Sequence, residues 1–206
     1  MYCAAALGIN MDASTLKQKY MGAGEKSKSN GHTDDIMSLG ICPNRKLAVT
    51  GSLGARPLII VWDSNSMEPL YQTKLGRNTR AVSTIRFSKN GKYFFCSDKH
   101  NDSNVYCFEV EGAKLVGQNK CGADPVFDAE SGNNNTFACA TKRGVYFFDY
   151  DGHELNKKRG IFGGNPNNAM VTVTFNTDNN SFYSGSAKGQ IYEWKGNSCL
   201  KNIKIH

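Results

Sequence analysis

The sequence predicts an all-β fold made of β-propeller blades, and three observations support this expectation. Short runs of β-branched and aromatic residues alternate with turns rich in Asn, Asp and Gly, which is the pattern of strands joined by hairpins. No stretch of the chain shows sustained helical periodicity. Four similar segments also follow one another, each running turn, strand, turn, strand, short loop and strand.

An aromatic residue ends each segment and defines the repeat length. Successive aromatics lie 46, 40 and 46 residues apart, which is the period of four-stranded propeller blades. We therefore expect them at equivalent sites on the third strand of each blade, and we call them the anchor residues. The anchor residues are Trp62, Phe108, Phe148 and Trp194.

The predicted strands follow in order within the four segments. Turns such as Pro43-Asn44 and Lys89-Asn90-Gly91 separate the first two strands of a segment, because Pro, Asn and Gly favour tight turns. The strands are predicted at 36–41, 47–50 and 58–62, then 82–87, 93–97 and 105–110, then 126–127, 136–140 and 145–148, and finally 171–175, 181–184 and 191–194.

These segments predict an incomplete propeller of about four complete four-stranded blades, with partial blades at both ends. At about 43 residues per blade, a seven-bladed ring would need roughly 300 residues. We therefore expect other blades or other chains to complete the ring. Residues 1–30 are expected to be the end of a preceding blade and a connection, residues 31–76, 77–120, 121–164 and 165–200 the four blades, and residues 201–206 the start of another.

The first segment carries the fullest repeat signature. His32 lies 30 residues before Trp62, and the dipeptides Gly31-His32 and Trp62-Asp63 mark WD repeats. His32, a Ser or Thr of the second strand and the Trp62 indole can hydrogen-bond one another, with Thr50 or Ser52 in the middle. We therefore expect His32, Thr50, Trp62 and Asp63 to serve as structural residues of the blade, together with the other anchor residues.

The repeat signature is incomplete in all four segments. In the first segment, residues 54–56 (Gly-Ala-Arg) replace the Asp that usually precedes the third strand. The other segments keep Ser97, Ser184 or Ser186 without the His. No Ser, Cys or carboxylate forms a recognised catalytic motif with any of the four His residues, so we expect no enzymatic activity.

The charge distribution suggests an acidic partner. The formal net charge is +7, and residues 156–206 contain seven Lys and Arg but only two acidic residues. The segment Lys157-Lys158-Arg159 is predicted to be a basic loop that contacts a partner, although a solvated loop would have the same composition. A nucleic acid is a less favoured partner, because RNA recognition usually needs exposed aromatics and the aromatics here occupy strand positions.

Cysteine usage and hydropathy exclude other classes of protein. The seven cysteines form no CxxC pair and no metal-ligand spacing, so the sequence favours a reducing compartment and no metal or other cofactor. The longest strongly apolar run, residues 58–62, suits a buried strand and is too short to span a membrane. We therefore expect a cytoplasmic protein without a membrane partner.

Several segments resemble the echinoderm microtubule-associated-protein-like (EMAP-like) family. Residues 31–36 (Gly-His-Thr-Asp-Asp-Ile), 60–63 (Ile-Val-Trp-Asp) and 87–92 (Phe-Ser-Lys-Asn-Gly-Lys) carry part of this likeness. Residues 158–163 (Lys-Arg-Gly-Ile-Phe-Gly) and 192–196 (Tyr-Glu-Trp-Lys-Gly) are more specific than the dipeptides that all WD repeats share. The resemblance covers nearly the whole chain.

The resemblance implies a propeller that binds microtubules in the cytoplasm, the spindle or a cilium. The resulting hypothesis is a non-catalytic module that docks on tubulin or on other cytoskeletal or axonemal proteins. The alternative is a general protein-interaction scaffold in a signalling or RNA-associated complex that makes no contact with tubulin.

Overall fold

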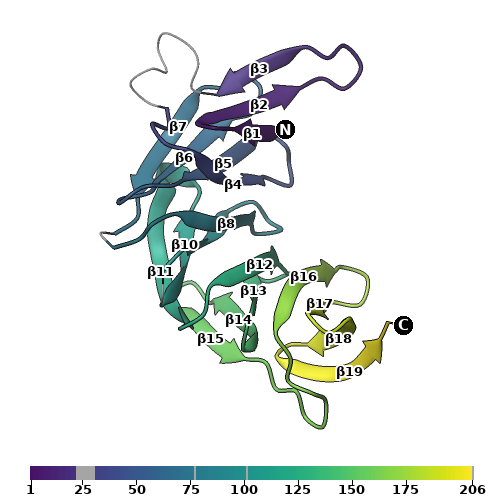
Figure 1. Cartoon of the computed structure of the whole chain (residues 1–206). Coiled ribbons are helices and arrows are strands. Elements are labelled where there is room, and N and C mark those ends of the chain that lie inside the picture. Colours follow the sequence, from purple (N-terminus) through teal and green to yellow (C-terminus); the bar gives the residue numbers. More distant parts are fainter. Residues whose placement is uncertain (22–30, 77, 101, 206) are drawn as a thin grey trace.

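The computed structural model describes residues 1–206 except residues 22–30, 77, 101 and 206. Within this part the chain is built from β-strands and one short 3-10 turn (Figure 1). The elements are β1 (Tyr2–Ala4), β2 (Leu7–Met11), β3 (Gln18–Met21), β4 (Ile36–Ile41), β5 (Leu47–Ser52), β6 (Leu58–Asp63), β7 (Pro69–Lys74), β8 (Val82–Phe87), β9 (Tyr93–Asp98), β10 (Ser103–Glu109), η1 (Glu111–Ala113), β11 (Lys114–Gly122), β12 (Val126–Ser131), β13 (Thr136–Thr141), β14 (Gly144–Tyr150), β15 (Leu155–Arg159), β16 (Met170–Asn176), β17 (Ser181–Ser186), β18 (Gln190–Lys195) and β19 (Ser198–Lys204).

The strands form one three-stranded sheet, β1–β3, and four four-stranded sheets, β4–β7, β8–β11, β12–β15 and β16–β19. Every sheet is an antiparallel meander in which sequence neighbours pair. We call the four-stranded sheets blades 1 to 4. The all-β prediction is confirmed, and the blades follow one another along an open arc (Figure 1).

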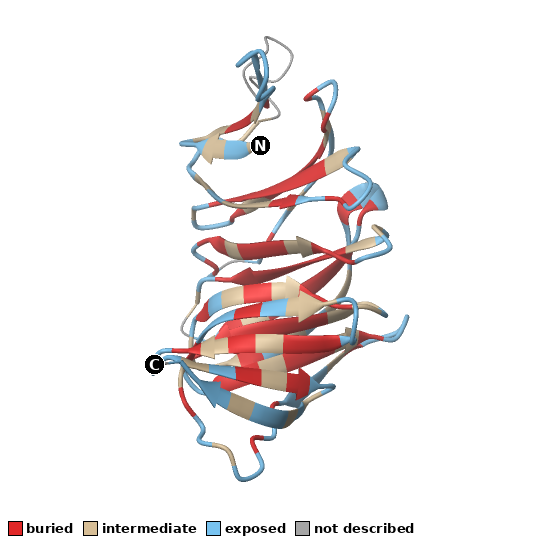
Figure 2. Cartoon of the chain, turned by 90° about the vertical axis from the view of Figure 1, so that its right-hand side faces the viewer, coloured by how far each residue is buried: buried red, intermediate tan, exposed pale blue. Residues whose placement is uncertain are grey.

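The blades converge at their first strands. β4 packs on β8, β8 on β12 and β12 on β16, so the first strands line the inner side of the arc. The fourth strands β7, β11, β15 and β19 form the opposite edge of each sheet and lie on the outer rim. Viewed from the side, the sheets are stacked, with buried residues concentrated between them (Figure 2).

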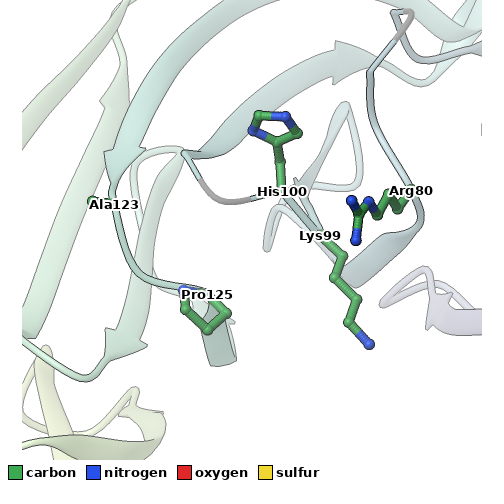
Figure 3. A pocket seen from close by; sticks show the side chains of 5 residues that line it. All are labelled: Arg80, Lys99, His100, Ala123 and Pro125. Atoms are coloured by element: carbon green, nitrogen blue, oxygen red, sulfur yellow. The ribbon is translucent and has the colours of Figure 1, made fainter.

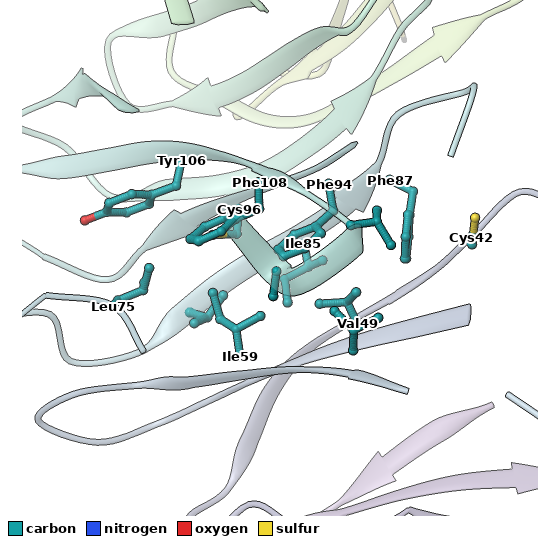
Figure 4. Close-up of a cluster of buried hydrophobic side chains, with 14 residues drawn as sticks. Cys42, Val49, Ile59, Leu75, Ile85, Phe87, Phe94, Cys96, Tyr106 and Phe108 are labelled. Carbon is teal, nitrogen blue, oxygen red and sulfur yellow. The ribbon is translucent and has the colours of Figure 1, made fainter. Parts of the chain in front are cut away.

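Apolar side chains fill the space between successive sheets. The cluster between blades 1 and 2 has 14 buried members, among them Val49 and Ile59 from one sheet and Phe94 and Phe108 from the other (Figure 4). Similar clusters lie between the other neighbouring sheets, including the β1–β3 sheet and blade 1. Each blade therefore depends on its neighbours for its core, as expected when one sheet cannot bury both faces alone.

Residues 201–204 were expected to begin another blade, and this is wrong. β19 pairs with β18 along its length, for example Ile191 with Ile203, so these residues complete blade 4. The physical reason is the tight turn at Gly196, whose positive φ of 57° returns the chain along β18. His206 lies outside the described residues, as do residues 22–30 of the expected connection. β11 also extends to Gly122, two residues past the expected blade boundary.

Candidate functional site

The first candidate site is the hydrogen-bond set of blade 1. The Thr50 hydroxyl lies at its centre and is fully buried. Its Oγ1 accepts a hydrogen bond from Trp62 Nε1 at 2.7 Å and lies 2.6 Å from His32 Nε2. Ser52, the alternative middle residue, instead accepts a hydrogen bond from the Leu58 backbone N–H at 3.0 Å. The set ties the segment before β4 to the second and third strands of the blade.

His32 is held as a neutral imidazole. Burial lowers its pKa to about 4, because the charged form would lose its hydration. The second ring nitrogen, Nδ1, is buried and has no hydrogen-bond partner among the described residues. The Asp that usually precedes the third strand, and could accept a hydrogen bond from Nδ1, is missing here because residues 54–56 are Gly-Ala-Arg. The Thr50 hydroxyl next to His32 is fully buried and also accepts the Trp62 indole N–H, so the three side chains form a closed hydrogen-bond network inside the blade.

The four anchor residues occupy one position in the sheets. Trp62, Phe108, Phe148 and Trp194 each pair with the second residue of the preceding strand, and all are at most 2% exposed. Two residues beyond that partner, the four blades carry Thr50, Cys96, Cys139 and Ser184. The two Trp blades therefore have a hydroxyl at this position, and the two Phe blades have a buried thiol.

This pairing of residue types has a physical cause. A buried indole N–H needs an acceptor, and Ser184 Oγ accepts a hydrogen bond from Trp194 Nε1 at 2.8 Å. A Phe ring has no donor, so a Cys that behaves as a small apolar residue is sufficient beside it. Ser97 and Ser186 therefore do not occupy the position that the sequence pattern suggested for them, although the periodicity of the anchors was enough to locate Cys96 and Ser184.

Asp63 forms the turn between β6 and β7. Its Oδ1 accepts hydrogen bonds from the backbone N–H groups of Asn65 at 2.9 Å and Ser66 at 2.8 Å. These bonds, that from Ser66 first, hold the pKa of Asp63 below its usual value. Asp151 makes the same turn between β14 and β15. Both carboxylates thus stabilise hairpins, in agreement with a structural role.

The segment Lys157–Arg159 was expected to be a loop, and this is wrong. It lies in β15, the outer strand of blade 3, because residues 155–159 pair with β14. Strand geometry directs Lys158 to the face opposite that of Lys157 and Arg159. Lys157 Nζ donates to the Lys120 carbonyl at 2.8 Å, and Lys158 Nζ lies 3.5 Å from Asp149 Oδ1. The three exposed cations therefore do not form a single patch.

A basic hollow that the sequence pattern did not identify lies at one end of blade 2, among its turn after β9 and its connections to blades 1 and 3. Its volume is about 350 Å³, and it is lined by Arg80, Lys99, His100, Ala123 and Pro125 (Figure 3). These residues come from three separate connections, one before β8, one after β9 and one between β11 and β12. Only the tertiary structure brings them together. The sequence signal was the Lys or Arg that recurs after each second strand.

Two classes of site are not seen in the part of the chain that the structure describes. It contains no group of three or more His, Cys, Asp or Glu residues placed to hold a metal ion. Among the same residues there is no helix that is both long enough and apolar enough to cross a membrane.

Solved structures with similar folds are WD-repeat propellers. The WD40 repeats of RRP9 superpose with a TM-score of 0.73 and 16% identity, over 97% of this chain and 57% of that one. The β-propeller domain of Cps50 (Swd1) from Myceliophteria thermophila gives a TM-score of 0.67 and 13% identity, over 83% of this chain and 56% of that one. At these identities the likeness shows the fold alone.

Sequence relatives indicate which group of WD-repeat proteins the chain resembles. The ciliary WD repeat-containing protein ctxp80 of Euplotoides octocarinatus is 26% identical over 100% of this chain and 30% of its own length. The echinoderm microtubule-associated protein-like 1 of Homo sapiens is 29% identical over 80% of this chain and 22% of its own length. The 77 kDa echinoderm microtubule-associated protein of Strongylocentrotus purpuratus is 28% identical, over 82% and 26%. The chain thus spans less than a third of the length of these relatives.

The family model described as the echinoderm microtubule-associated protein first beta-propeller matches residues 30–206, which include all four blades. The expected resemblance is confirmed. By this match and by its blade architecture, the chain belongs to the echinoderm microtubule-associated protein family of WD-repeat proteins.

Proposed function

We propose that this chain is a non-catalytic, microtubule-associated module that docks on tubulin or on other cytoskeletal or axonemal proteins. The observation that carries the proposal is the family match over residues 30–206. Relatives named as microtubule-associated or ciliary support a proposed site of action on the cytoskeleton of the cytoplasm or in a cilium.

Charge supports the same proposal. Microtubule surfaces are acidic, and the chain carries a formal net charge of +7. Exposed cations attract an acidic surface over a Debye length of about 8 Å at physiological salt. We therefore expect the association to weaken as the salt concentration rises.

The outer rim of blade 3 is one candidate contact. Lys157, Lys158 and Arg159 are exposed on β15. Further contacts with the microtubule surface would come from Lys and Arg residues on the other outer strands. The ammonium groups of Lys157 and Lys158 already contact the Lys120 carbonyl and the Asp149 carboxylate, so they are only partly available to a partner. We therefore expect this segment to contribute part of the binding rather than all of it.

Co-sedimentation with assembled microtubules tests the proposal. The wild-type chain should pellet saturably, and raising the salt concentration should release it. Replacing Lys157, Lys158 and Arg159 together with Ala should lower affinity several-fold, roughly two- to fivefold, if each screened contact is weak. Circular dichroism should show an unchanged fold, because all three side chains are exposed.

A matched control removes the same charge elsewhere. The Ala variant of Arg45, Lys46 and Lys92, which lie in turns between first and second strands, should bind more like wild type. Equal losses in the two variants would indicate nonspecific attraction and remove the β15 segment from the interface. Failure of the wild-type chain to bind saturably even at low salt would refute the tubulin proposal and favour the general scaffold.

A further inference from the structure

The innermost strand of every blade contains a β-bulge at the same place. In β4, β8, β12 and β16 the pairing with the second strand skips one residue, the second of the strand. A bulge leaves that residue unpaired and redirects its side chain. The bulge residues are Met37, Ser83, Phe127 and Val171, spaced 46, 44 and 44 apart.

Three of the four bulge residues are large, apolar and exposed. Met37 is 45% exposed, Phe127 50% and Val171 45%. The exception is Ser83, whose hydroxyl turns back to the backbone and lies 2.8 Å from Ser97 Oγ. The strands that carry Phe127 and Val171, β12 and β16, pack directly on each other, whereas β8 lies between them and the strand of Met37. The bulge residues are at the end of the blades where the second strands finish, since Ile36 pairs with Ser52 and Val126 with Thr141.

The same end of the blades is basic. Each turn between a second and a third strand carries an exposed Lys or Arg, and these residues are Arg56, Lys99, Lys142 and Lys188. We call this end the bulge face. By contrast, three of the four third-to-fourth-strand turns at the opposite end carry acidic residues, which are Glu68, Glu111, Asp151 and Glu154.

Two acidic groups of the bulge face near its hollow form ion pairs within the protein. Asp124 pairs with Arg143 at 3.0 Å, and Asp102 lies 3.9 Å from Lys120. Asp34 and Asp35 belong to the segment that enters blade 1, where the Leu53 N–H donates to the Asp35 carbonyl and the Gly54 N–H to the Arg80 carbonyl. The hollow itself is lined by Arg80, Lys99 and His100, without a carboxylate (Figure 3). The hollow therefore offers a positively charged lining, and Phe127 follows the lining residue Pro125 by two positions along the chain.

We infer that the bulge face binds an acidic, extended protein segment that carries a bulky apolar residue. The carboxylates of the segment would enter the hollow beside Arg80 and Lys99, and its apolar side chain would cover Phe127 and Val171. An apolar centre with a charged rim is the usual anatomy of a protein-binding patch. A nucleic acid fits less well, since the exposed apolar groups include two aliphatic residues and one aromatic ring, and strand binding by stacking uses aromatic platforms.

The inference rests on the proposed function only in that both concern an acidic partner. Fluorescence anisotropy with a labelled synthetic peptide of about ten Glu residues around one central Phe tests it directly on the full chain. Arg80→Glu with Lys99→Glu should weaken binding at least about tenfold at about 0.15 M salt. Phe127→Ser should weaken binding of the peptide about threefold or more. A peptide with Gly in place of Phe should bind the wild-type chain as weakly as the Phe-containing peptide binds the Phe127→Ser variant.

Matched variants guard against loss of folding and against simple charge effects. Ser already occupies the bulge position of blade 2, so Phe127→Ser should keep the thermal unfolding midpoint. Lys46→Glu with Lys92→Glu changes the net charge equally on the opposite end and should leave the affinity for the peptide within about twofold.

Three results would overturn the inference. They are equal losses from the two charge-reversal pairs, no effect of Phe127→Ser, and tighter binding of a single-stranded oligonucleotide that displaces the peptide. Peptide binding without microtubule pelleting would support this inference and refute the tubulin contact of the proposed function. Microtubule pelleting that survives the Arg80 and Lys99 reversals would support the proposed function, and an absence of peptide binding by the wild-type chain would refute the inference.

Discussion

The hydroxyl of Ser184 should stabilise blade 4 only because Trp194 presents an indole N–H to it. The two side chains are at most 1% exposed and are joined by a 2.8 Å hydrogen bond. Ser184→Ala would leave a buried donor unpaired, which costs about 1–3 kcal/mol. Trp194→Phe removes the donor but also opens space, at a cost of roughly 1–3 kcal/mol.

The double variant separates these effects. In Ser184→Ala with Trp194→Phe the lost hydrogen bond is counted once rather than twice, so the free-energy losses should fall short of additivity by about 1 kcal/mol. Blades 2 and 3 already use Phe without a hydroxyl partner, so the combination suits the fold. Urea denaturation followed by far-UV circular dichroism measures the free energy of unfolding without relying on the Trp fluorescence that the variant removes.

Ser131 provides a matched control within the same protein. Its side chain is fully buried and its hydroxyl has no hydrogen-bond partner among the described residues. Ser131→Ala should therefore leave the free energy of unfolding unchanged within about 0.5 kcal/mol or raise it, since burying an unpaired hydroxyl is unfavourable. Equal destabilisation by Ser131→Ala and Ser184→Ala, or strict additivity in the double variant, would refute the pairing argument.

Two further predictions concern charge. His32 has a folded pKa of about 4 against about 6.5 when unfolded, so its contribution is intact above about pH 6.5 and is lost as the pH falls toward 4. Wild type should therefore lose up to about 3 kcal/mol more unfolding free energy than His32→Gln between pH 7 and 4, and parallel urea titrations of the two proteins would contradict this. Asp128 joins the inner strands of three blades, accepting a hydrogen bond from Thr172 at 2.7 Å and pairing with Arg86 at 3.4 Å. Asp128→Asn should lower the free energy of unfolding by about 1–2 kcal/mol in the same urea assay. Asp102→Asn, which removes an exposed ion pair, should lower it by less than about 0.5 kcal/mol. Equal losses would show that Asp128 does not stabilise the contact between blades.

Local periodicity was enough to predict the blades. A strand exposes alternate residues to opposite faces, and hairpin turns use a small set of residue types, so the order of strands follows from short-range pattern. Trp62 and Trp194 could be placed on third strands for the same reason, and the Gly-His and Trp-Asp dipeptides identified the hydrogen-bond set of blade 1.

Local pattern misplaced two segments. The cations of Lys157–Arg159 suggested a loop, because strands of soluble proteins more often mix charged with apolar residues. They occur in a strand here because β15 is the outer edge of its sheet, where both faces of the strand reach solvent. Residues 201–204 were likewise assigned to another blade, since the pattern of three strands per segment left the fourth strand unmarked.

The sequence by itself determined the all-β repeat architecture, the family and the residues that hold each blade together, because all of these depend on spacing along the chain. Only the tertiary structure decided which surface those blades present. Arg80, Lys99 and Pro125 come from three separate connections and line one hollow, and the strands of Phe127 and Val171 pack side by side. No window of sequence contains such neighbours, since the contacts form between separate strands only when their apolar faces are buried together.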